Sequence, residues 1–273
     1  MDAFIDFFTH LTSLQKLIWI IGLLTVFWLF EGAYPLRRFH YKKWAHAMPN
    51  LILLSSTILI NVLFGLATLG VFNWLEENEF GLLNLVEFPV WVELVLAIML
   101  LDFLAQYVVH FMLHKVRFMW RFHMVHHSDT NIDVTSGTRH HPIDFVMRET
   151  FALLAIVIAG LPLAYYVIYR VLTILFTYFS HANISLPIWL DKIISLVFIS
   201  PNTHKFHHHH KVPWTDTNYG NIFSLWDRAF GTFVYHNPKD IVYGLDILDD
   251  DKSNDILYQL KVPFIYKKNN MEI

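Results

Sequence analysis

Three long apolar stretches constrain the fold of this chain more than any other feature of its sequence. They run approximately over residues 17–34, 50–74 and 89–109. The hydrocarbon core of a bilayer is about 30 Å thick, and an α-helix needs roughly 20 residues to cross it. Because each stretch is about that long, the sequence predicts three transmembrane helices. The charged fraction of only 16% agrees with residence in lipid, since soluble domains carry about 25%.

A fourth apolar region, residues 145–180, differs from the other three because it is interrupted near its middle. The interruption reads "AGLP" over residues 159–162, and a glycine closely followed by a proline is a helix-stop and turn signal. We therefore expect a helical hairpin that enters and leaves on one side of the membrane. A shorter amphipathic stretch, residues 186–199, is expected to lie in the membrane interface.

The charges between the apolar stretches predict an orientation. The segment "RRFHYKK" (37–43) follows the first stretch, and three cations follow the third, whereas the loop between the second and third carries only acidic charges. The positive-inside rule then places residues 36–48 and the chain after residue 114 in the cytoplasm, and the N-terminus outside. A hairpin at 145–180 would return the C-terminal third to the same cytoplasmic face.

The absence of cysteine narrows the chemistry that the chain can support. Without thiols there can be no disulfide, thiolate zinc finger, iron–sulfur cluster or thiolate-ligated haem. A net charge of −3 gives no argument for a nucleic-acid partner. Any metal must therefore be held by nitrogen and oxygen donors, and the chain has 17 histidines to supply them.

Eight of these histidines form three clusters with a shared spacing. The clusters read "HFMLH", "HMVHH" and "HKFHH". Their histidines are His110 and His114, then His123, His126 and His127, and finally His204, His207 and His208. A four-residue spacing puts two imidazoles on one face of a helix, and metal binding needs such convergence because each ion takes several ligands. Eight imidazoles are too many for one ion, so two ions are expected.

The spacing does not choose the metal, because nitrogen-rich sites suit iron, zinc, copper or nickel. Six of the remaining histidines have no such pattern and are expected to be ordinary surface or hydrogen-bonded groups. These are His10, His40, His46, His209, His210 and His236.

In this order and between these apolar stretches, the three clusters resemble the fatty acid hydroxylase/sterol desaturase superfamily. Three further segments resemble it too, namely "TRHHPID" (138–144), "FSHAN" (179–183) and "NYGNIFSLWDRAFGTF" (218–233). The resemblance covers roughly residues 90–245. It implies a non-haem di-iron enzyme that uses O2 to oxidise an unactivated C–H bond of a lipid.

The resemblance also implies roles for individual residues. The eight clustered histidines would ligate two iron ions, and His181 of "FSHAN" matches an additional ligand position. His141 of "RHHP" could be a ligand or could support one from behind. No catalytic residue beyond the metal ligands is implied. Asp102, Asn183, Asn218 and Asp227 could orient ligands or could be ordinary paired polar groups.

An oxygenase needs electrons, and the chain contains no dinucleotide fingerprint, haem-attachment motif or cysteine cluster. A separate electron-donor protein is therefore expected to dock on the cytoplasmic cap. Lys205, Lys211 and Arg228 lie near the third cluster and could form part of that docking face, or could be solvated charges.

The sequence thus predicts an all-α integral membrane protein with three transmembrane helices, a helical hairpin and a cytoplasmic helical cap holding a di-metal site. We divide it into N-terminal membrane helices (1–88), a hydroxylase or desaturase region (89–245) and a C-terminal tail (246–273). The expected function is O2-dependent hydroxylation or desaturation of a sterol, fatty acyl or alkyl lipid, with iron as the metal and zinc possible in isolated protein. The alternatives are a zinc-dependent membrane hydrolase or isomerase, and a metal transport protein.

Overall fold

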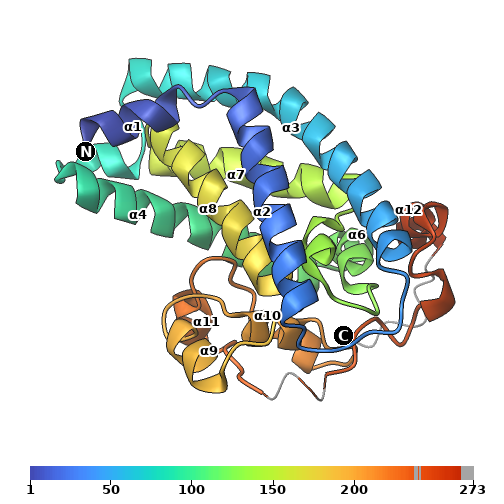
Figure 1. Ribbon diagram of the computed structural model, residues 1–273. Helices are drawn as coiled ribbons and strands as arrows, with labels where there is room; N and C mark the ends of the chain where they lie inside the picture. Colours follow the sequence, from blue (N-terminus) through green and yellow to red (C-terminus); the bar gives the residue numbers. More distant parts are fainter. Residues whose placement is uncertain (237–238, 240, 266–273) are drawn as a thin grey trace.

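The computed structural model describes residues 1–236, 239 and 241–265 of the chain. In this part of the chain all regular secondary structure is helical (Figure 1), and β pairing is limited to two isolated bridges. The predicted all-α class is therefore confirmed.

Four helices of the described chain are long and apolar enough to cross a membrane, so the protein is an integral membrane protein. They are α2 (Ser13–Ala33), α3 (Lys43–Asn78), the continuous helix Val90–Lys115 and α8 (Leu163–His181). The first three correspond to the three predicted transmembrane helices. The fourth is the second arm of the predicted hairpin, which is itself long enough to span.

Helix α3 begins earlier than the sequence predicts. We expected the second membrane helix to start after Pro49, but the helix starts at Lys43 and contains Pro49 within its early turns. Pro49 is the seventh residue of the helix and has no N–H, so the i→i−4 hydrogen bond to the Ala45 carbonyl oxygen cannot form. The additional turns carry His46 and Asn50, both buried, into contact with the segment that follows the second histidine cluster.

The third membrane helix delivers the first histidine cluster. It is composed of α4 (Val90–Asp102), a π-helical turn (Phe103–Val108) and α5 (Val109–Lys115). The π turn ends two residues before His110, and such turns occur often at functional sites. Because the helix runs on to Lys115, His110 and His114 share its last two turns.

The predicted hairpin is present. Helix α7 (Pro142–Ala159) ends at Gly160, which adopts a left-handed conformation with φ of +65°. A Cβ at Gly160 would lie 2.1 Å from the carbonyl oxygen of Phe80, so only glycine fits there. Helix α8 then returns the chain, because His181 at its end meets His126, and His140, just before α7, stacks on that same ring.

Short elements build the cap at this end of the bundle. They are α6 (Arg117–His127), the 3-10 turn Val134–Thr138, α9 (Ile188–Ile194), α10 (Pro201–His207), α11 (Leu225–Ala229) and α12 (Ile256–Ile265). Figure 1 shows α9, α10 and α11 grouped below the long helices, with α12 beside α6. In the stretch expected to lie in the interface, α9 buries Asp191 and exposes Ile188, Trp189 and Ile193.

The main apolar core lies among the long helices, away from the cap. Leu101 of the third membrane helix, Ile156 of α7 and Tyr169 of α8 are fully buried within it. At the N-terminus, α1 (Asp2–Thr9) packs on this core through Ile5 and Phe8. This core holds the long helices together and so fixes the relative positions of their cap-facing ends, where the histidines lie.

Candidate metal centre

The structure brings nine of the ten predicted site histidines into two adjoining groups. Group one consists of His110, His114, His123, His127 and His207, and group two of His126, His181, His204 and His208. All nine side chains are buried, and within each group one ring nitrogen per residue lies within 4.8 Å of every other. The nine rings come from four segments of the chain, namely two membrane helices and two cap helices, which would otherwise have no reason to bury so many imidazoles at one place.

Helix geometry sorts the histidines between the groups. The pairs His110–His114 and His123–His127 are four residues apart, and each pair stays within group one. Two histidines that are adjacent in sequence join different groups, because successive side chains on a helix point about 100° apart. On α6, His126 therefore joins group two while His127 joins group one.

The same separation occurs after α10. His207 joins group one, and the next residue, His208, joins group two with His204. The rings of His127 and His208, one from each group, stack with centroids 4.6 Å apart. The two groups are therefore direct neighbours, as expected of a two-ion site.

The nitrogens of group two have a geometry that hydrogen bonding alone cannot satisfy. The Nε2 atom of His181 lies 3.2 Å from Nε2 of His126, 3.0 Å from Nε2 of His204 and 3.2 Å from Nε2 of His208. A neutral imidazole nitrogen offers either one proton or one lone pair. His181 donates its Nδ1 proton to the Thr177 carbonyl oxygen at 2.7 Å, so its Nε2 carries one lone pair, which can accept a hydrogen bond from only one of the three nitrogens that face it.

A bound cation would resolve this convergence. For metal–nitrogen distances of about 2.0–2.1 Å, neighbouring ligand nitrogens are roughly 2.8–3.4 Å apart, and the observed separations fall in that range. In group one, three buried rings have Nε2 atoms without a hydrogen-bond partner in the described part of the protein. These are His114, His127 and His207. The residues present therefore fit a pair of metal ions.

The outer nitrogens of several rings are held by oxygen atoms of the cap. The Nδ1–H groups of His110 and His207 donate to the carbonyl oxygens of Tyr219 at 2.8 Å and Thr217 at 2.6 Å. The Nδ1 of His114 bonds Asp216 Oδ1 at 3.2 Å. Such partners fix the tautomer, so that the Nε2 lone pair points inward, and they orient the ring for a metal.

Asp144, near the start of α7, connects the two groups. Its Oδ1 lies 3.4 Å from Nδ1 of His123, and its Oδ2 accepts a hydrogen bond from Nδ1 of His140 at 2.8 Å. The His140 ring stacks on His126 of group two at 4.8 Å. Arg148 donates to the same Oδ2 at 3.3 Å and balances the charge of the carboxylate.

Burial keeps the cap imidazoles neutral. It lowers the pKa of His123 to about 3. Burial, together with repulsion from neighbouring imidazoles, holds the pKa of five more rings well below the usual value of 6.5. These are His126, His127, His204, His207 and His208. Neutral rings at pH 7 have the free lone pairs that a metal ligand needs.

The polar residues near the clusters act mainly through the loop after residue 217. Asp102 accepts hydrogen bonds from the backbone amides of Ile222 and Phe223, each at 3.1 Å, and does not contact a histidine ring. Asp227 accepts from the amides of Tyr219 at 2.7 Å and Gly220 at 2.9 Å. Both carboxylates thus hold the loop whose Tyr219 carbonyl orients His110.

The two asparagines named from the sequence also bind backbone. Asn218 has a φ of +54° and bonds Thr203 and Val234. Asn183 bonds the backbone of Arg37, which follows the first membrane helix. Like the two carboxylates, these asparagines position segments of the cap.

Two residues named from the sequence take no part in either group. His141 lies outside both groups, where its Nδ1 accepts a hydrogen bond from the Ile143 amide at the start of α7 and its Nε2 approaches the Leu260 carbonyl oxygen at 3.4 Å. Lys205 is neither a docking residue nor a solvated charge, because it is fully buried, with its Nζ 3.4 Å from the Pro201 carbonyl oxygen. Lys205 is buried because it lies on the same side of α10 as His204 and His208, and this side faces the metal centre. Lys211 and Arg228 are exposed, as expected.

The six histidines that were expected to be ordinary groups also lie outside both groups. His46 is buried and bonds Asp129 at 2.8 Å, so it is a hydrogen-bonded core group. Sequence reasoning missed Asp144 and Asp216 as partners of the ligand rings. The segment "TRHHPID" contained Asp144, but its register against His123 depends on how α6 and α7 pack.

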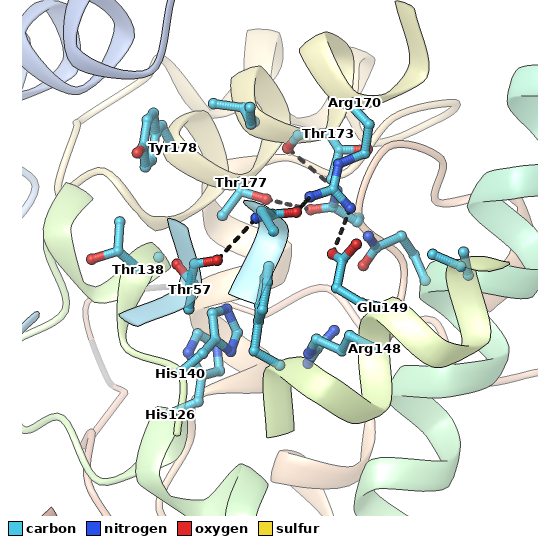
Figure 2. A pocket seen from close by; sticks show the side chains of 18 of the residues that line it. Thr57, His126, Thr138, His140, Arg148, Glu149, Arg170, Thr173, Thr177 and Tyr178 are labelled. Atoms are coloured by element: carbon cyan, nitrogen blue, oxygen red, sulfur yellow. Dashed lines mark hydrogen bonds and ion pairs between the residues drawn. The ribbon is translucent and has the colours of Figure 1, made fainter. Parts of the chain in front are cut away.

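A cavity of about 170 Å³ opens beside both groups. His110 of group one lines it, as do His126, His181 and His204 of group two. Figure 2 shows its polar lining, in which Arg170 of α8 and Glu149 of α7 face each other at one end and His126 lies at the other. Sequence reasoning missed this pair, although ionisable residues within an apolar region are a recognisable signal.

Comparisons with known proteins agree with this site. Residues 94–232, just over half of the chain, match the fatty acid hydroxylase family. The chain is similar to ornithine lipid hydroxylase OlsE of Rhizobium tropici, with 28% identity over 56% of this chain and 44% of that protein. It is also similar to human alkylglycerol monooxygenase, with 28% identity over 51% of this chain and 30% of that protein.

A third relative is a very-long-chain aldehyde decarbonylase of Oryza sativa, with 26% identity over 48% of this chain and 51% of that protein. The matched region thus spans about half or less of the length of each of these relatives. No solved structure matches the chain.

Proposed function

Since this chain belongs to the fatty acid hydroxylase family, we propose that it is a membrane-bound lipid oxygenase whose two histidine groups each hold one iron ion. The nine histidines of groups one and two are the proposed ligands, and His141 is left out of the set. The observation that carries the proposal is the convergence of unpartnered, neutral imidazole nitrogens beside a cavity within the membrane helices.

The ions would supply the activation of O2 that side-chain acids and bases cannot provide for an alkyl C–H bond. The protein's own contribution is to hold the ligand rings and to shape the space beside them. Thr177, Thr217 and Tyr219 orient the rings through their carbonyl oxygens, and Asp144 and Asp216 through carboxylates.

The cavity supports a lipid as the substrate. Apolar side chains of three membrane helices contribute to its wall, among them Ile20 of α2, Ile58 of α3 and Ile174 of α8. A hydrocarbon segment lying along them would reach His110 and His126 with water largely excluded. The relatives named above are described as acting on an ornithine lipid, an alkylglycerol and a very-long-chain aldehyde, which supports a lipid with a long apolar chain.

The proposal includes a cytoplasmic site and a separate electron donor. Basic segments flank the cap-facing ends of the membrane helices, including Arg37 and Arg38 after α2 and Lys115 and Arg117 after the third membrane helix. The positive-inside rule favours the cytoplasm for this end. The chain has no cysteine and no dinucleotide fingerprint, so the reducing electrons would come from another protein that docks on the cap.

The test combines metal analysis with lipid chemistry. Protein purified without air should contain about two iron ions per chain, as expected from two groups of ligands. Cells that express the gene under O2 should accumulate an oxidised lipid that is missing from cells without the gene and from cells grown without O2. Protein that takes up no iron, together with an unchanged lipid profile, would contradict the proposal.

A further inference from the structure

We propose that the cavity beside the metal centre selects an uncharged lipid through one small polar group, and that Arg170, Glu149 and Asn61 hold this group. The inference rests on the proposed function, because it names the substrate class of the same site. It predicts a hydroxyl or ether oxygen as the recognised group, rather than a carboxylate, phosphate or ammonium.

The three residues form a connected cluster across three helices. Arg170 of α8 donates from Nη1 to Glu149 Oε1 of α7 at 2.7 Å, and from Nη2 to Asn61 Oδ1 of α3 at 3.0 Å. Asn61 in turn donates to the Thr57 carbonyl oxygen at 3.2 Å. Ionisable groups among membrane helices are expensive to bury and usually mark a functional site. Thr57 and the three residues of the cluster all line the cavity.

The cluster lies at the far end of the cavity from the metal centre. Arg170 precedes His181 by about three turns of α8, which corresponds to roughly 16 Å along the helix axis. In Figure 2 the Arg170–Glu149 pair is at the upper end of the cavity, and His126 and His140 are at the lower end. A lipid segment that spans the cavity would place its polar group against Arg170 and a carbon atom beside the histidines.

The charges of the lining favour a neutral group. Its two arginines are each paired, Arg170 with Glu149 and Arg148 with Asp144. A carboxylate bound to Arg170 would place a second negative charge beside Glu149, which is unfavourable away from water. An ammonium group would face two arginines. A hydroxyl or ether oxygen brings no charge, and Glu149 and Asn61 use two of the five N–H donors of Arg170.

The size of the cavity also favours a small polar group. Its volume is about 170 Å³, and an engineered apolar cavity of about 150 Å³ accepts a molecule the size of benzene. The space therefore holds a short lipid segment at a time, with the remaining chain outside it. A glycerophosphate headgroup or a sugar is larger than benzene and would leave no room for an apolar segment beside the histidines.

The experiment measures binding of three labelled lipids of one chain length to the purified, iron-loaded protein in lipid nanodiscs. The lipids are a primary alcohol, the corresponding fatty acid and the corresponding alkane. We expect the alcohol to bind at least about tenfold more tightly than either of the others, which corresponds to one or two buried hydrogen bonds. Equal binding of all three, or tighter binding of the fatty acid, would overturn the inference.

Two variants assign the preference to the cluster. The double substitution Arg170→Leu with Glu149→Leu removes the ion pair as a unit and leaves no unpaired charge among the helices. Asn61→Leu removes the amide alone and decides the question if the double variant fails to insert. Its matched control is Asn78→Leu on the same helix, because the Asn78 amide also donates to a carbonyl oxygen one turn earlier but does not line the cavity.

We expect the double variant and Asn61→Leu to lose most of the preference for the alcohol, with alkane binding unchanged, and Asn78→Leu to retain it. If the cluster only joined the three helices, the variants would unfold at a lower temperature and would still prefer the alcohol, which would overturn the inference. Failure of the proposed function is a separate result, since it would appear as a lipid that binds to the iron-loaded protein and is not oxidised under O2 with electrons supplied.

Discussion

Individual imidazoles in this protein are directed by carbonyl and carboxylate oxygens that lie far from them in sequence. His110 depends on Tyr219, and His114 depends on Asp216. A ligand candidate therefore differs from an ordinary histidine in the groups that surround its ring. His141, which belongs to a histidine-rich motif, caps a helix instead of joining either group.

The residue scale gives a direct prediction for the metal content. Replacing His207 or His126 by Ala removes one ligand from group one or group two, and we expect each variant to retain about one iron ion or fewer and to lose at least about a hundredfold in lipid oxidation. Iron analysis and a lipid assay on membrane-inserted protein measure both effects. The matched variant His141→Ala should keep both ions. Normal iron content in His207→Ala would refute the ligand assignment.

Among the elements, α6 carries three of the proposed ligands and is held in place by the predicted C-terminal tail. Trp120 and Met124 of α6 pack against Leu245 and against Val262 of α12. The tail is thus part of the cap as far as residue 265, and residues 266–273 lie outside the described residues. The orientation of α6 consequently depends on chain beyond the matched family region.

A hydrogen bond from Ser128 to Gln259 tests this dependence. Gln259 is fully buried, accepts from Ser128 Oγ at 2.9 Å and donates to the Ser253 carbonyl oxygen at 3.0 Å. Gln259→Ala removes both hydrogen bonds from a fully buried position, which should lower the free energy of unfolding by about 1–3 kcal/mol and weaken iron retention. Thermal unfolding followed by iron analysis measures both, with the exposed Leu257→Ala on the same helix as the control. Equal stability of the two variants would contradict the proposed support of α6.

The whole molecule is organised by its orientation in the membrane, and the absence of cysteine makes that orientation easy to test. A single cysteine at exposed Lys211, on the cap, should react with a membrane-impermeant maleimide from the cytoplasmic side only. A single cysteine at exposed Glu77, at the opposite end of α3, should react from the other side only. Labelling of Lys211→Cys from outside would refute the cytoplasmic assignment.

The buried imidazoles also make the stability of the metal-free protein depend on pH. Burial lowers the pKa of His123 to about 3 in the folded protein, whereas an unfolded histidine titrates near 6.5. As the pH falls below about 6.5, the unfolded chain takes up a proton that the folded chain does not, so the unfolded state is favoured by about 1.4 kcal/mol per pH unit for each such ring.

We therefore expect the unfolding temperature of the metal-free protein to fall between pH 7.5 and 5.5. The decrease should be smaller in His123→Gln, where one such ring is gone, and unchanged in His236→Gln, where the replaced ring is exposed. Unfolding followed by tryptophan fluorescence at the two pH values measures the shift. An unfolding temperature that does not depend on pH would show that these rings are not held neutral by burial.

The sequence by itself determined the membrane helices, the returning hairpin and the identity of the clustered histidines. These follow from local properties, namely apolar length, a glycine–proline interruption and a four-residue spacing on a helix. Only the tertiary structure decided that His207 and His208 serve different groups, that Lys205 is buried, and that Asp144 and Asp216 hold ligand rings. It also placed Arg170 opposite Glu149. Each of these outcomes depends on the angle and register at which separate helices pack, and no short stretch of sequence contains that information.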